Sequence, residues 1–249
     1  MGRYRVQRLR DMGGNPETTI RDTREFMSYY PIFVDLKNKK AVVVGGGLVA
    51  QRKIETLLTC GADVHIISQD LTTELQNCLA EGKIRLLGSE FSENYLKDAF
   101  IVIAATDDSA LNRMVSKIAR EKGMLVNVVD QPMDCNFIVP SVIKRGDLLI
   151  AVSTSGKSPA MARRIRERLS RQFGGEYGDF LTLLGKLRKE ILSKGLSQEE
   201  NSRIFHELVD SPILESIRRK DWKDIASNLE RILQMRFSPE DVINYIKAE

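Results

Sequence analysis

The sequence predicts an α/β protein whose first half folds around a doubly wound parallel sheet. Short apolar runs alternate with amphipathic stretches between residues 40 and 129, which is the pattern of strands joined by crossover helices. These runs lack a polar face, as expected for strands that helices cover on both sides. A glycine-rich turn between the first strand and the first helix is a further mark of this fold class.

The elements of this half follow from the apolar runs and from the residues that end each helix. The first helix should end at Gly61 and the third at Gly123, because glycine suits the position that closes a helix. Right-handed crossovers would place the carboxyl ends of the strands along one edge. The expected strands are Lys40–Val44, Asp63–Ser68, Ile84–Leu87, Ala99–Ala105 and Leu125–Val129, and the expected helices are Leu48–Cys60, Thr72–Glu81 and Ser109–Lys122.

Three glycines, Gly45-Gly46-Gly47, follow the first strand and lead into the first helix. With Ala50 they fit the GxGxxG/A pattern of Rossmann-like dinucleotide-binding folds. In that pattern Gly45 permits a tight turn, Gly47 leaves room for a pyrophosphate, and the small third residue lets the helix pack on the strand. The helix start also offers free N–H groups to an anion. Alone the pattern is weak evidence, so NAD binding is a hypothesis at this point.

The pattern changes after residue 136. Phe137–Val142 and Asp147–Ser153 are predicted strands, separated by Lys144-Arg145-Gly146. No helix fits between them, so they should pair antiparallel. Two strands alone are marginally stable, so we expect a partner sheet, for example from a second copy of the chain.

The rest of the chain is predicted to be helical. Pro159 suits the first turn of a helix, Ser197 and Glu200 form a capping box, and Ser238-Pro239 begins another helix. We therefore divide the chain into four parts. They are a basic arm at 1–26, a Rossmann domain at 27–136, a pair of strands at 137–158, and a helical domain with a C-terminal extension at 159–249.

Composition excludes several classes of function. A hydrophobic content of 42% and a charged content of 29% are ordinary for a globular protein, and a net charge of +4 does not indicate nucleic acid as a partner. No apolar run is long enough to span a membrane. The three cysteines have neither CxxC nor zinc spacing, which favours reduced thiols and a cytoplasmic location.

The first 26 residues differ in composition from the rest of the chain. They are rich in arginine and lack the apolar core of a signal peptide. We expect a disordered tail, and a basic arm that binds an acidic partner is the alternative. Foldable pattern begins abruptly near Tyr29, so Met27 is a candidate natural start.

A doubly wound sheet places its ligand site at the carboxyl ends of the strands. The predicted segments there are Gly45–Val49, Ser68–Leu71, Thr106–Asp108 and Asn127–Asp134. Gln69 and Asp70 follow the second strand, where an acidic residue commonly holds the ribose hydroxyls of NAD. Asp70 could equally cap the next helix. No arginine follows this strand, which favours NAD over NADP.

The segment after the fourth strand contains Thr106 and Asp107, which lie where the adenosine half of the nucleotide would pass. Asp108 is expected to cap the following helix. Asp130 ends the Asn127-Val-Val-Asp130 run and should face the cleft, where a carboxylate could move a proton during redox chemistry. The alternative for Asp130 is a turn, because Asp130-Gln-Pro132 has turn chemistry.

A hydroxyl-rich loop precedes the first helix of the helical part. Ser153, Thr154, Ser155, Lys157 and Ser158 lie in it, and loops of this kind bind anions, although it lacks Walker spacing. An arginine-rich helix follows, and a solvated face is the usual meaning of such a run. Its position next to the loop favours a polyanionic ligand. The arginines are Arg163, Arg164, Arg166, Arg168 and Arg171, with Glu167 among them.

No cluster of histidine, cysteine and acidic residues predicts a resident metal. His65 lies inside a predicted strand and is expected to be structural, while His206 is expected at the surface of the helical part. Cys135 lies near the proposed site, and we expect it to be a packed thiol.

Several segments, in order and with matching spacing, show that the sequence resembles the precorrin-2 dehydrogenases of sirohaem synthesis, which also form the front module of multifunctional sirohaem synthases. The resemblance runs from about Tyr29 to Gly195. The matching segments are Tyr30–Leu36, Val44–Lys53, Ala104–Asp108, Asn127–Asp130, Phe137–Ser141 and Ser155–Pro159.

The resemblance implies an activity. Precorrin-2, a tetrapyrrole with many carboxylate arms, is oxidised to sirohydrochlorin while NAD takes a hydride, and some members also insert ferrous iron. The family is an intertwined homodimer whose middle segment pairs strands between subunits, which would make 137–158 dimerisation strands.

The resemblance also assigns residues. The essential aspartate of the family falls on Asp130. The NAD contacts, with those expected from the glycine turn and the fourth strand, are Gly45, Gly47, Leu48, Val49, Gln69, Asp70, Thr106 and Asp107. The carboxylates of the tetrapyrrole would be held by Ser153, Thr154, Ser155, Lys157, Arg163 and Arg166.

The chain departs from the family in three places. It has no room for the methyltransferase module of the large synthases, the N-terminal arm is extra, and the tail beyond Gly195 resembles the family's helical domain only loosely. The family has no dedicated metal motif for iron insertion. The rival hypothesis is a regulatory NAD-sensing module, which would need neither Asp130 nor the hydroxyl-rich loop with its arginines.

Overall fold

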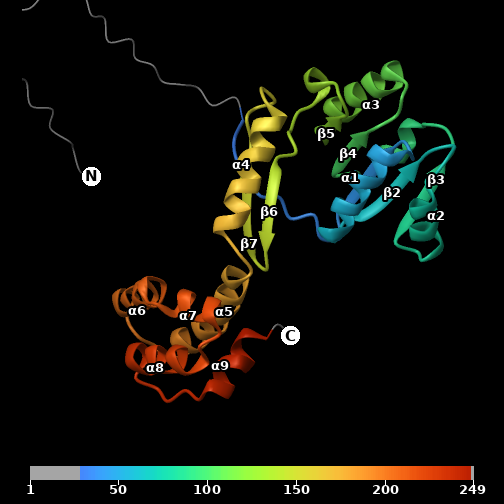
Figure 1. Cartoon of the computed structure of the whole chain (residues 1–249). Helices are drawn as coiled ribbons and strands as arrows, with labels where there is room; N and C mark the ends of the chain where they lie inside the picture. Colours follow the sequence, from blue (N-terminus) through green and yellow to red (C-terminus); the bar gives the residue numbers. More distant parts are fainter. Residues whose placement is uncertain (1–28, 248–249) are drawn as a thin grey trace, which may run out of the picture. The chain divides into compact units, whose positions relative to one another are not determined.

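A computed structural model describes residues 29–247, so the predicted arm at 1–26 and the hypothesis on Met27 lie outside the described residues. The first half forms a five-stranded parallel sheet in the order β3-β2-β1-β4-β5 (Figure 1). This confirms the predicted fold class. The strands are β1 Lys40–Val44, β2 Asp63–Ile67, β3 Ile84–Gly88, β4 Ile101–Ala104 and β5 Leu125–Val128.

The strand order places β1 at the point where the winding of the sheet reverses. β1 pairs in parallel with β2, with Lys40 opposite Asp63, and on its other side with β4, with Ala41 opposite Ile101. Val42 and Val43 are fully buried, one in the core cluster on each face, which explains the continuous apolar run of this strand.

Helices cover both faces of the sheet. α1 (Leu48–Thr59) and α2 (Thr73–Ala80) contribute Ile54 and Leu75 to the core on one face. α3 (Ser109–Glu121) and the short 3₁₀ helix η1 (Glu93–Leu96) contribute Val115 and Leu96 to the core on the other. The Asp108 carboxylate accepts hydrogen bonds from the N–H groups of the first turn of α3, which confirms the predicted cap.

The two antiparallel strands are β6 (Ser141–Arg145) and β7 (Leu148–Val152), so the prediction of a strand at Phe137–Val142 was wrong by several residues. Lys144 and Arg145 belong to β6, and Gly146 adopts a left-handed conformation in the turn. Before β6, the edge of β5 is bonded by the backbone and the side chain of Asn136 instead of by a strand. Asn136 Oδ1 accepts from Val126 N at 2.7 Å, and its Nδ2 donates to the Met124 carbonyl.

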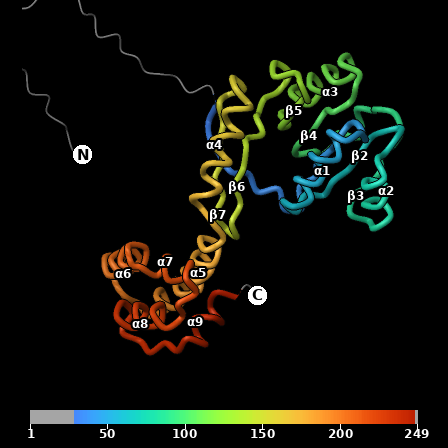
Figure 2. Tube along the Cα trace, in the orientation of Figure 1, coloured from blue at the N-terminus to red at the C-terminus, as the bar shows by residue number. Residues whose placement is uncertain are grey.

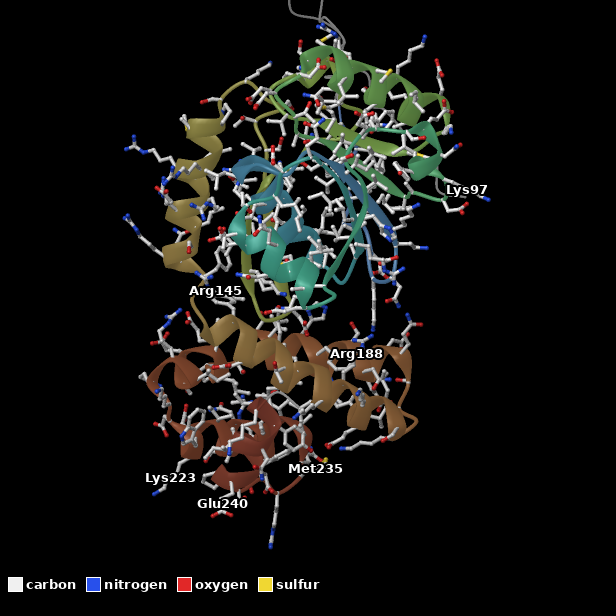
Figure 3. All side chains as sticks on the ribbon, turned by 90° about the vertical axis from the view of Figure 1, so that its right-hand side faces the viewer. Lys97, Arg145, Arg188, Lys223, Met235 and Glu240 are labelled. Atoms are coloured by element: carbon white, nitrogen blue, oxygen red, sulfur yellow. The ribbon has the colours of Figure 1, made fainter. Side chains whose placement is uncertain are left out.

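The hairpin of β6 and β7 packs against α4 (Pro159–Gln172) on one face (Figure 1). Arg145, labelled in Figure 3, fixes the end of this helix. Its Nε donates to the Phe173 carbonyl at 3.0 Å, and its Nη2 donates to Ser170 Oγ at 2.7 Å. The carbonyls at a helix end lack partners within the helix, so this arginine satisfies groups that would otherwise need water.

The last five helices share a core of their own, which includes Phe180, Leu187, Ile213, Leu229 and Val242. They are the orange to red segments of Figure 2. The predicted capping box of Ser197 and Glu200 is confirmed. The predicted helix start at Ser238 is confirmed too, and Ser238 forms a second capping box with Asp241. The helices are α5 Glu176–Ser193, α6 Gln198–Asp210, α7 Ile213–Arg219, α8 Trp222–Leu233 and α9 Pro239–Ile246.

None of the helices between residues 29 and 247 combines the length and the apolar character needed to cross a membrane.

Candidate functional site

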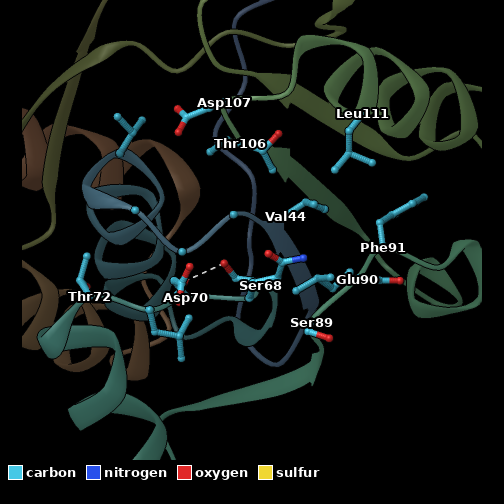
Figure 4. Close-up of a pocket in the computed structure, with 18 of the residues that line it drawn as sticks. Val44, Ser68, Asp70, Thr72, Ser89, Glu90, Phe91, Thr106, Asp107 and Leu111 are labelled. Atoms are coloured by element: carbon cyan, nitrogen blue, oxygen red, sulfur yellow. Dashed lines mark hydrogen bonds between the residues drawn. The ribbon is translucent and has the colours of Figure 1, made fainter.

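A cavity of about 920 Å³ lies at the carboxyl ends of the strands. It falls within the range typical of small-molecule sites, about 300–1,000 Å³. In Figure 4, Phe91 and Leu111 border it on one side and Ser68 and Asp70 on the other. Its lining comes from the segments that follow four strands: Gly45–Val49 after β1, Ser68–Thr72 after β2, Ser89–Phe91 after β3, and Ala105–Asp107 with Leu111 and Met114 after β4.

The glycines of the turn have different reasons to be glycine. Gly45 has φ +115°, and a Cβ on it would come 2.3 Å from the Ala105 carbonyl oxygen. A Cβ on Gly46 would come 2.0 Å from the carbonyl oxygen of Asp70. A Cβ on Gly47 would meet nothing within 4 Å, because the space beyond it is open. Two glycines therefore allow the backbones to pack, and the third leaves room for a ligand.

The start of α1 offers unpartnered donors to that open space. Gly47 is the N-cap and has no side chain to bond the first N–H groups, and no acidic residue stands in the first turn. Leu48 and Val49 are 76% and 41% exposed. Free N–H groups and the positive end of the helix dipole suit an anion, so this end of the cavity fits the pyrophosphate of a dinucleotide.

The loop after β2 is held by the Ser68 hydroxyl and by the glycine turn. Ser68 Oγ donates to the Asp70 carbonyl at 2.7 Å, and the Thr72 N–H donates to the Gly46 carbonyl. Gln69 and Asp70 line the cavity and are exposed, as a contact to a ribose requires. Thr72 is the N-cap of α2, so the alternative that Asp70 caps this helix was wrong.

The loop after β4 is tied to α3 through Asn112, which is 2% exposed. Thr106 Oγ1 donates to Asn112 Oδ1 at 2.8 Å, and Asn112 Nδ2 donates to the Thr106 carbonyl at 2.8 Å. Thr106 and Asp107 both line the cavity. The sequence analysis missed Asn112. Its position near the start of the helix that follows the loop could have indicated that it holds the loop.

The lining after β3 was also missed. Ser89, Glu90 and Phe91 come directly after this strand, and the Ser68 N–H donates to the Gly88 carbonyl at 3.1 Å. That bond places the ends of β2 and β3 side by side. The third strand ends at the same edge as the others, so its following residues belonged among the candidates.

Asp130 lies elsewhere than expected. β5 ends at Val128, Asp130 is exposed in a left-handed conformation with φ +56°, and neither it nor any residue of Asn127–Asp134 lines the cavity. The expectation that Asp130 faces the cleft was wrong for this cavity, because the chain turns at Asp130 and runs back along the edge of β5. The turn alternative describes its backbone. The Val129 N–H still donates to the Ala104 carbonyl, next to the cavity wall.

The hydroxyl-rich loop forms a tight turn before α4. Ser155 and Gly156 both have positive φ, and the Lys157 N–H donates to the Thr154 carbonyl at 2.9 Å. Thr154 Oγ1 donates to the Ser158 carbonyl, so this hydroxyl is used within the loop. Ser153 Oγ accepts from the Ser155 N–H. Ser155 and Lys157 are exposed, and none of these residues lines the cavity.

The predicted arginine pair shares one carboxylate. Arg163 Nε lies 3.0 Å from Glu167 Oε1, and Arg166 Nη2 lies 3.5 Å from the same oxygen. The Arg163 side chain is 75% exposed and that of Arg166 is 36% exposed. Exposed pairs of this kind contribute about 0–1 kcal/mol, so both arginines can exchange Glu167 for the carboxylates of a ligand.

The remaining titratable candidates have structural environments. His65 is 8% exposed, and its Nε2 lies 2.8 Å from Asp63 Oδ2, while His206 is exposed on α6. The Cys135 thiol is half-buried and accepts from the Val128 N–H at 3.1 Å. Within residues 29–247, no group of three or more histidine, cysteine or acidic side chains could hold a metal ion.

Two family models match the chain. Residues 32–141 match a model described as "Putative NAD(P)-binding", and residues 145–172 match the model described as "Sirohaem biosynthesis protein central". The first range covers the parallel sheet and its cavity, and the second covers β7 and α4. The first match confirms the predicted cofactor, NAD. The description of that family covers NADP as well.

Relatives with curated names agree with these matches. The chain is 44% identical over 208 residues to siroheme synthase 1 of Serratia proteamaculans and 39% identical over 215 residues to the siroheme synthase of Nitrosococcus oceani. These alignments cover 84% and 86% of this chain but 44% and 46% of the relatives. The solved structure of SirC, a precorrin-2 dehydrogenase, matches with a TM-score of 0.70 and 28% identity, over 83% of this chain and all of that one.

The chain is similar to the precorrin-2 dehydrogenases and to the N-terminal part of the sirohaem synthases. It spans less than half the length of the curated relatives that it matches. These matches confirm the resemblance drawn from the sequence motifs, and the fold agrees with that of SirC. The roles of the individual site residues stay predictions.

Proposed function

We propose that this chain oxidises precorrin-2 to sirohydrochlorin with NAD as the hydride acceptor. One observation carries the proposal: a cavity of dinucleotide size opens beside Gly47 and the free start of α1, in a chain whose relatives are named siroheme synthases. SirC, a precorrin-2 dehydrogenase, shares the fold. NAD, when bound, would accept the hydride that leaves the tetrapyrrole.

The residues of the cavity would hold and orient the cofactor. Backbone N–H groups from Gly47 to Val49 face the pyrophosphate end, and Gln69 and Asp70 lie where the fold places a ribose. Thr106 and Asp107 line the adjoining wall. Holding both reactants in a reactive arrangement can contribute about 7–11 kcal/mol to lowering the barrier, so positioning could supply much of the rate.

Asp130 is proposed to take the proton that leaves the tetrapyrrole as NAD takes the hydride, or to orient the macrocycle. Its exposed carboxylate follows β5, one strand beyond the Ala105–Asp107 wall of the cavity. A substrate bound over this edge could contact Asp130 and the cofactor together.

Asp130→Asn is the matched test, because asparagine tolerates the left-handed conformation that Asp130 adopts. We expect the fold and the affinity for NADH to stay unchanged and turnover to be lost. Asp130→Ala should lose turnover too, with an added strain of about 1 kcal/mol or more. Turnover like that of the unsubstituted protein in Asp130→Asn would reject the role.

The carboxylates of the tetrapyrrole are proposed to bind at the start of α4. Ser153, Thr154, Ser155 and Lys157 form the turn before this helix, and Arg163 and Arg166 follow within its first turns. Contacts from several groups acting together are needed, because a single exposed ion pair contributes about 0–1 kcal/mol.

A homodimer is proposed from the hairpin. Val142 and Leu149 are 44% and 42% exposed on the face of β6 and β7 that lies away from α4, and a two-stranded sheet is marginally stable alone. Sedimentation equilibrium should give twice the mass of the chain, and Val142→Lys with Leu149→Lys should give a monomer. A monomer in the unsubstituted protein would refute the dimer.

The division of the chain at 136 and 158, the cytoplasmic location and the insertion of ferrous iron are further proposals that rest on the sequence. The extent of the domains can be measured by limited proteolysis, which should cut near these boundaries after it has removed the arm at 1–26.

Absorbance spectroscopy tests the activity directly. The protein, precorrin-2 and NAD are mixed, and we expect the spectrum of sirohydrochlorin together with NADH absorbance in equal amounts. Adding ferrous iron to the same cuvette tests chelation by the appearance of the sirohaem spectrum. NADH binding without turnover would reject the proposal and favour the rival, a regulatory NAD-sensing module.

A further inference from the structure

Three of the four hydroxyl groups that line the cavity donate their protons to other groups of the protein. Ser68 Oγ donates to the Asp70 carbonyl at 2.7 Å, and Thr106 Oγ1 donates to Asn112 Oδ1 at 2.8 Å. Thr72 Oγ1 donates to Gln51 Oε1 at 2.8 Å. Because a hydroxyl has one proton, these three groups offer only lone pairs to a ligand.

The charged groups of the cavity are all acidic. Asp70, Glu90 and Asp107 are exposed on its lining, and none of them forms a salt bridge with another described residue. No lysine or arginine occurs in the lining formed by residues 44–114. Ser89 and Gln69 are the neutral side-chain donors that remain. The acidic part of the cavity can accept hydrogen bonds from sugar hydroxyls and amino groups, and it repels a phosphate.

The glycine turn, in contrast, offers hydrogen-bond donors and carries no acidic side chain. The start of α1 provides backbone N–H groups without a capping side chain, and no acidic residue lies in its first turn. The cavity therefore has a donor end and an acceptor end. A dinucleotide fits with its pyrophosphate at the turn and its adenosine toward the loops after β2 and β3.

Glu90 lines the cavity beside the end of β2, which is where the fold would place a 2′-phosphate. The fold places the 2′-hydroxyl of the adenosine ribose at the end of β2. The Ser68 N–H donates to the Gly88 carbonyl at 3.1 Å, so the residues after β3 run beside those after β2. Glu90 is two residues past Gly88 and lines the cavity with Ser68 and Asp70.

We infer that Glu90 is a specificity-determining residue that excludes dinucleotides carrying a 2′-phosphate. The inference rests on the proposed binding of NAD and adds the residue that separates NAD from NADP. A 2′-phosphate carries close to two negative charges and would lie near the Glu90 carboxylate without a cation in the lining to neutralise it. The ribose hydroxyl of NAD can instead donate to that carboxylate.

Fluorescence titration with NADH and NADPH measures the selectivity of the protein at low ionic strength. The unsubstituted protein should bind NADH more tightly. In Glu90→Gln the ratio of the dissociation constants for NADPH and NADH should fall by about tenfold. The repulsion from one unit charge several ångströms away is large enough for this change. Glu90→Lys should lower this ratio further or reverse the preference, and added salt should reduce both effects. Glu121→Gln, an exposed change at the far end of α3, is the matched control and should leave the ratio unchanged.

The outcomes separate the inference from the proposed function. No NADH binding by the unsubstituted protein would refute the proposed cofactor site itself. NADH binding with equal affinity for NADPH, or a ratio that stays the same in Glu90→Gln and Glu90→Lys, would overturn the role of Glu90 and leave the cofactor site standing. Thermal unfolding of each variant checks that the fold is kept.

Discussion

A valine at position 47 should separate cofactor binding from stability. Gly47 has φ −79° and ψ −176°, a conformation open to any residue, and a side chain there meets no protein atom within 4 Å of its Cβ. The space that the side chain would fill is the space proposed for the pyrophosphate. Gly47→Val should therefore fold normally and bind NADH poorly.

The magnitudes follow from the local structure. At an N-cap, glycine is preferred to an apolar residue by up to about 1 kcal/mol, and replacing glycine regains about 0.4–1 kcal/mol by restricting the unfolded chain. The two contributions nearly cancel, so the free energy of unfolding should change by less than about 1 kcal/mol. Added bulk in a fitted pocket costs about 1–3 kcal/mol, which corresponds to roughly a 10- to 200-fold loss of affinity.

Gly45→Ala is the contrasting variant. Its φ of +115° is unfavourable for alanine, and the new Cβ would lie 2.3 Å from the Ala105 carbonyl oxygen. The free energy of unfolding should fall by about 3 kcal/mol or more. Urea unfolding and NADH titration on both variants test the pair. Unaltered NADH binding in Gly47→Val would refute the assignment of the turn to the pyrophosphate, and unaltered stability in Gly45→Ala would refute the close packing of Gly45 on Ala105.

Three further outcomes can be measured. Asn112→Ala should lower the free energy of unfolding by about 1–3 kcal/mol, because the buried amide holds the loop that lines the cavity. It should also raise KM for NAD more than it lowers kcat. A KM equal to that of the unsubstituted protein would refute the link between Asn112 and the cofactor site. Replacing Arg163 and Arg166 together with glutamine should weaken binding of the tetrapyrrole and reduce its dependence on salt, whereas an unchanged salt slope would mark a solvated face. Burial and the hydrogen bond to Glu190 raise the pKa of Tyr245 from 10 to about 12. The stability that the neutral phenol contributes should be present below pH 10 and lost as pH rises through 12, and a pH titration of Tyr245→Phe should lack that loss.

The sheet could be predicted because its information is local. β1 and β4 are apolar runs bounded by polar residues or glycine, and each strand ends within one or two residues of the expected place. Ser197 and Ser238 fixed helix starts through side chains three residues away. Such contacts are written in neighbouring positions of the sequence, so periodicity and capping patterns reveal them.

Contacts between distant segments explain the errors. Phe137 begins an apolar run that resembles a strand, but it packs against the core on the α1 face, while the Asn136 side chain bonds the edge of β5. Glu90 was missed because it joins the cavity only through the sheet order, which places the end of β3 beside the end of β2. Asp130 was placed in the cleft because its backbone was taken to be a strand end, whereas the turn removes it from the cavity.

The phosphate end of the cavity is built from main chain, and this affects how the protein can change. Leu48 and Val49 project outward, so exchanging their side chains leaves the N–H groups of α1 in place. Random mutagenesis selected for NADH binding should accept many residues at these two positions and almost none other than glycine at 45 and 46. A site of this kind can drift widely in sequence while keeping its ligand, because three glycines and a helix start preserve what the side chains do not supply.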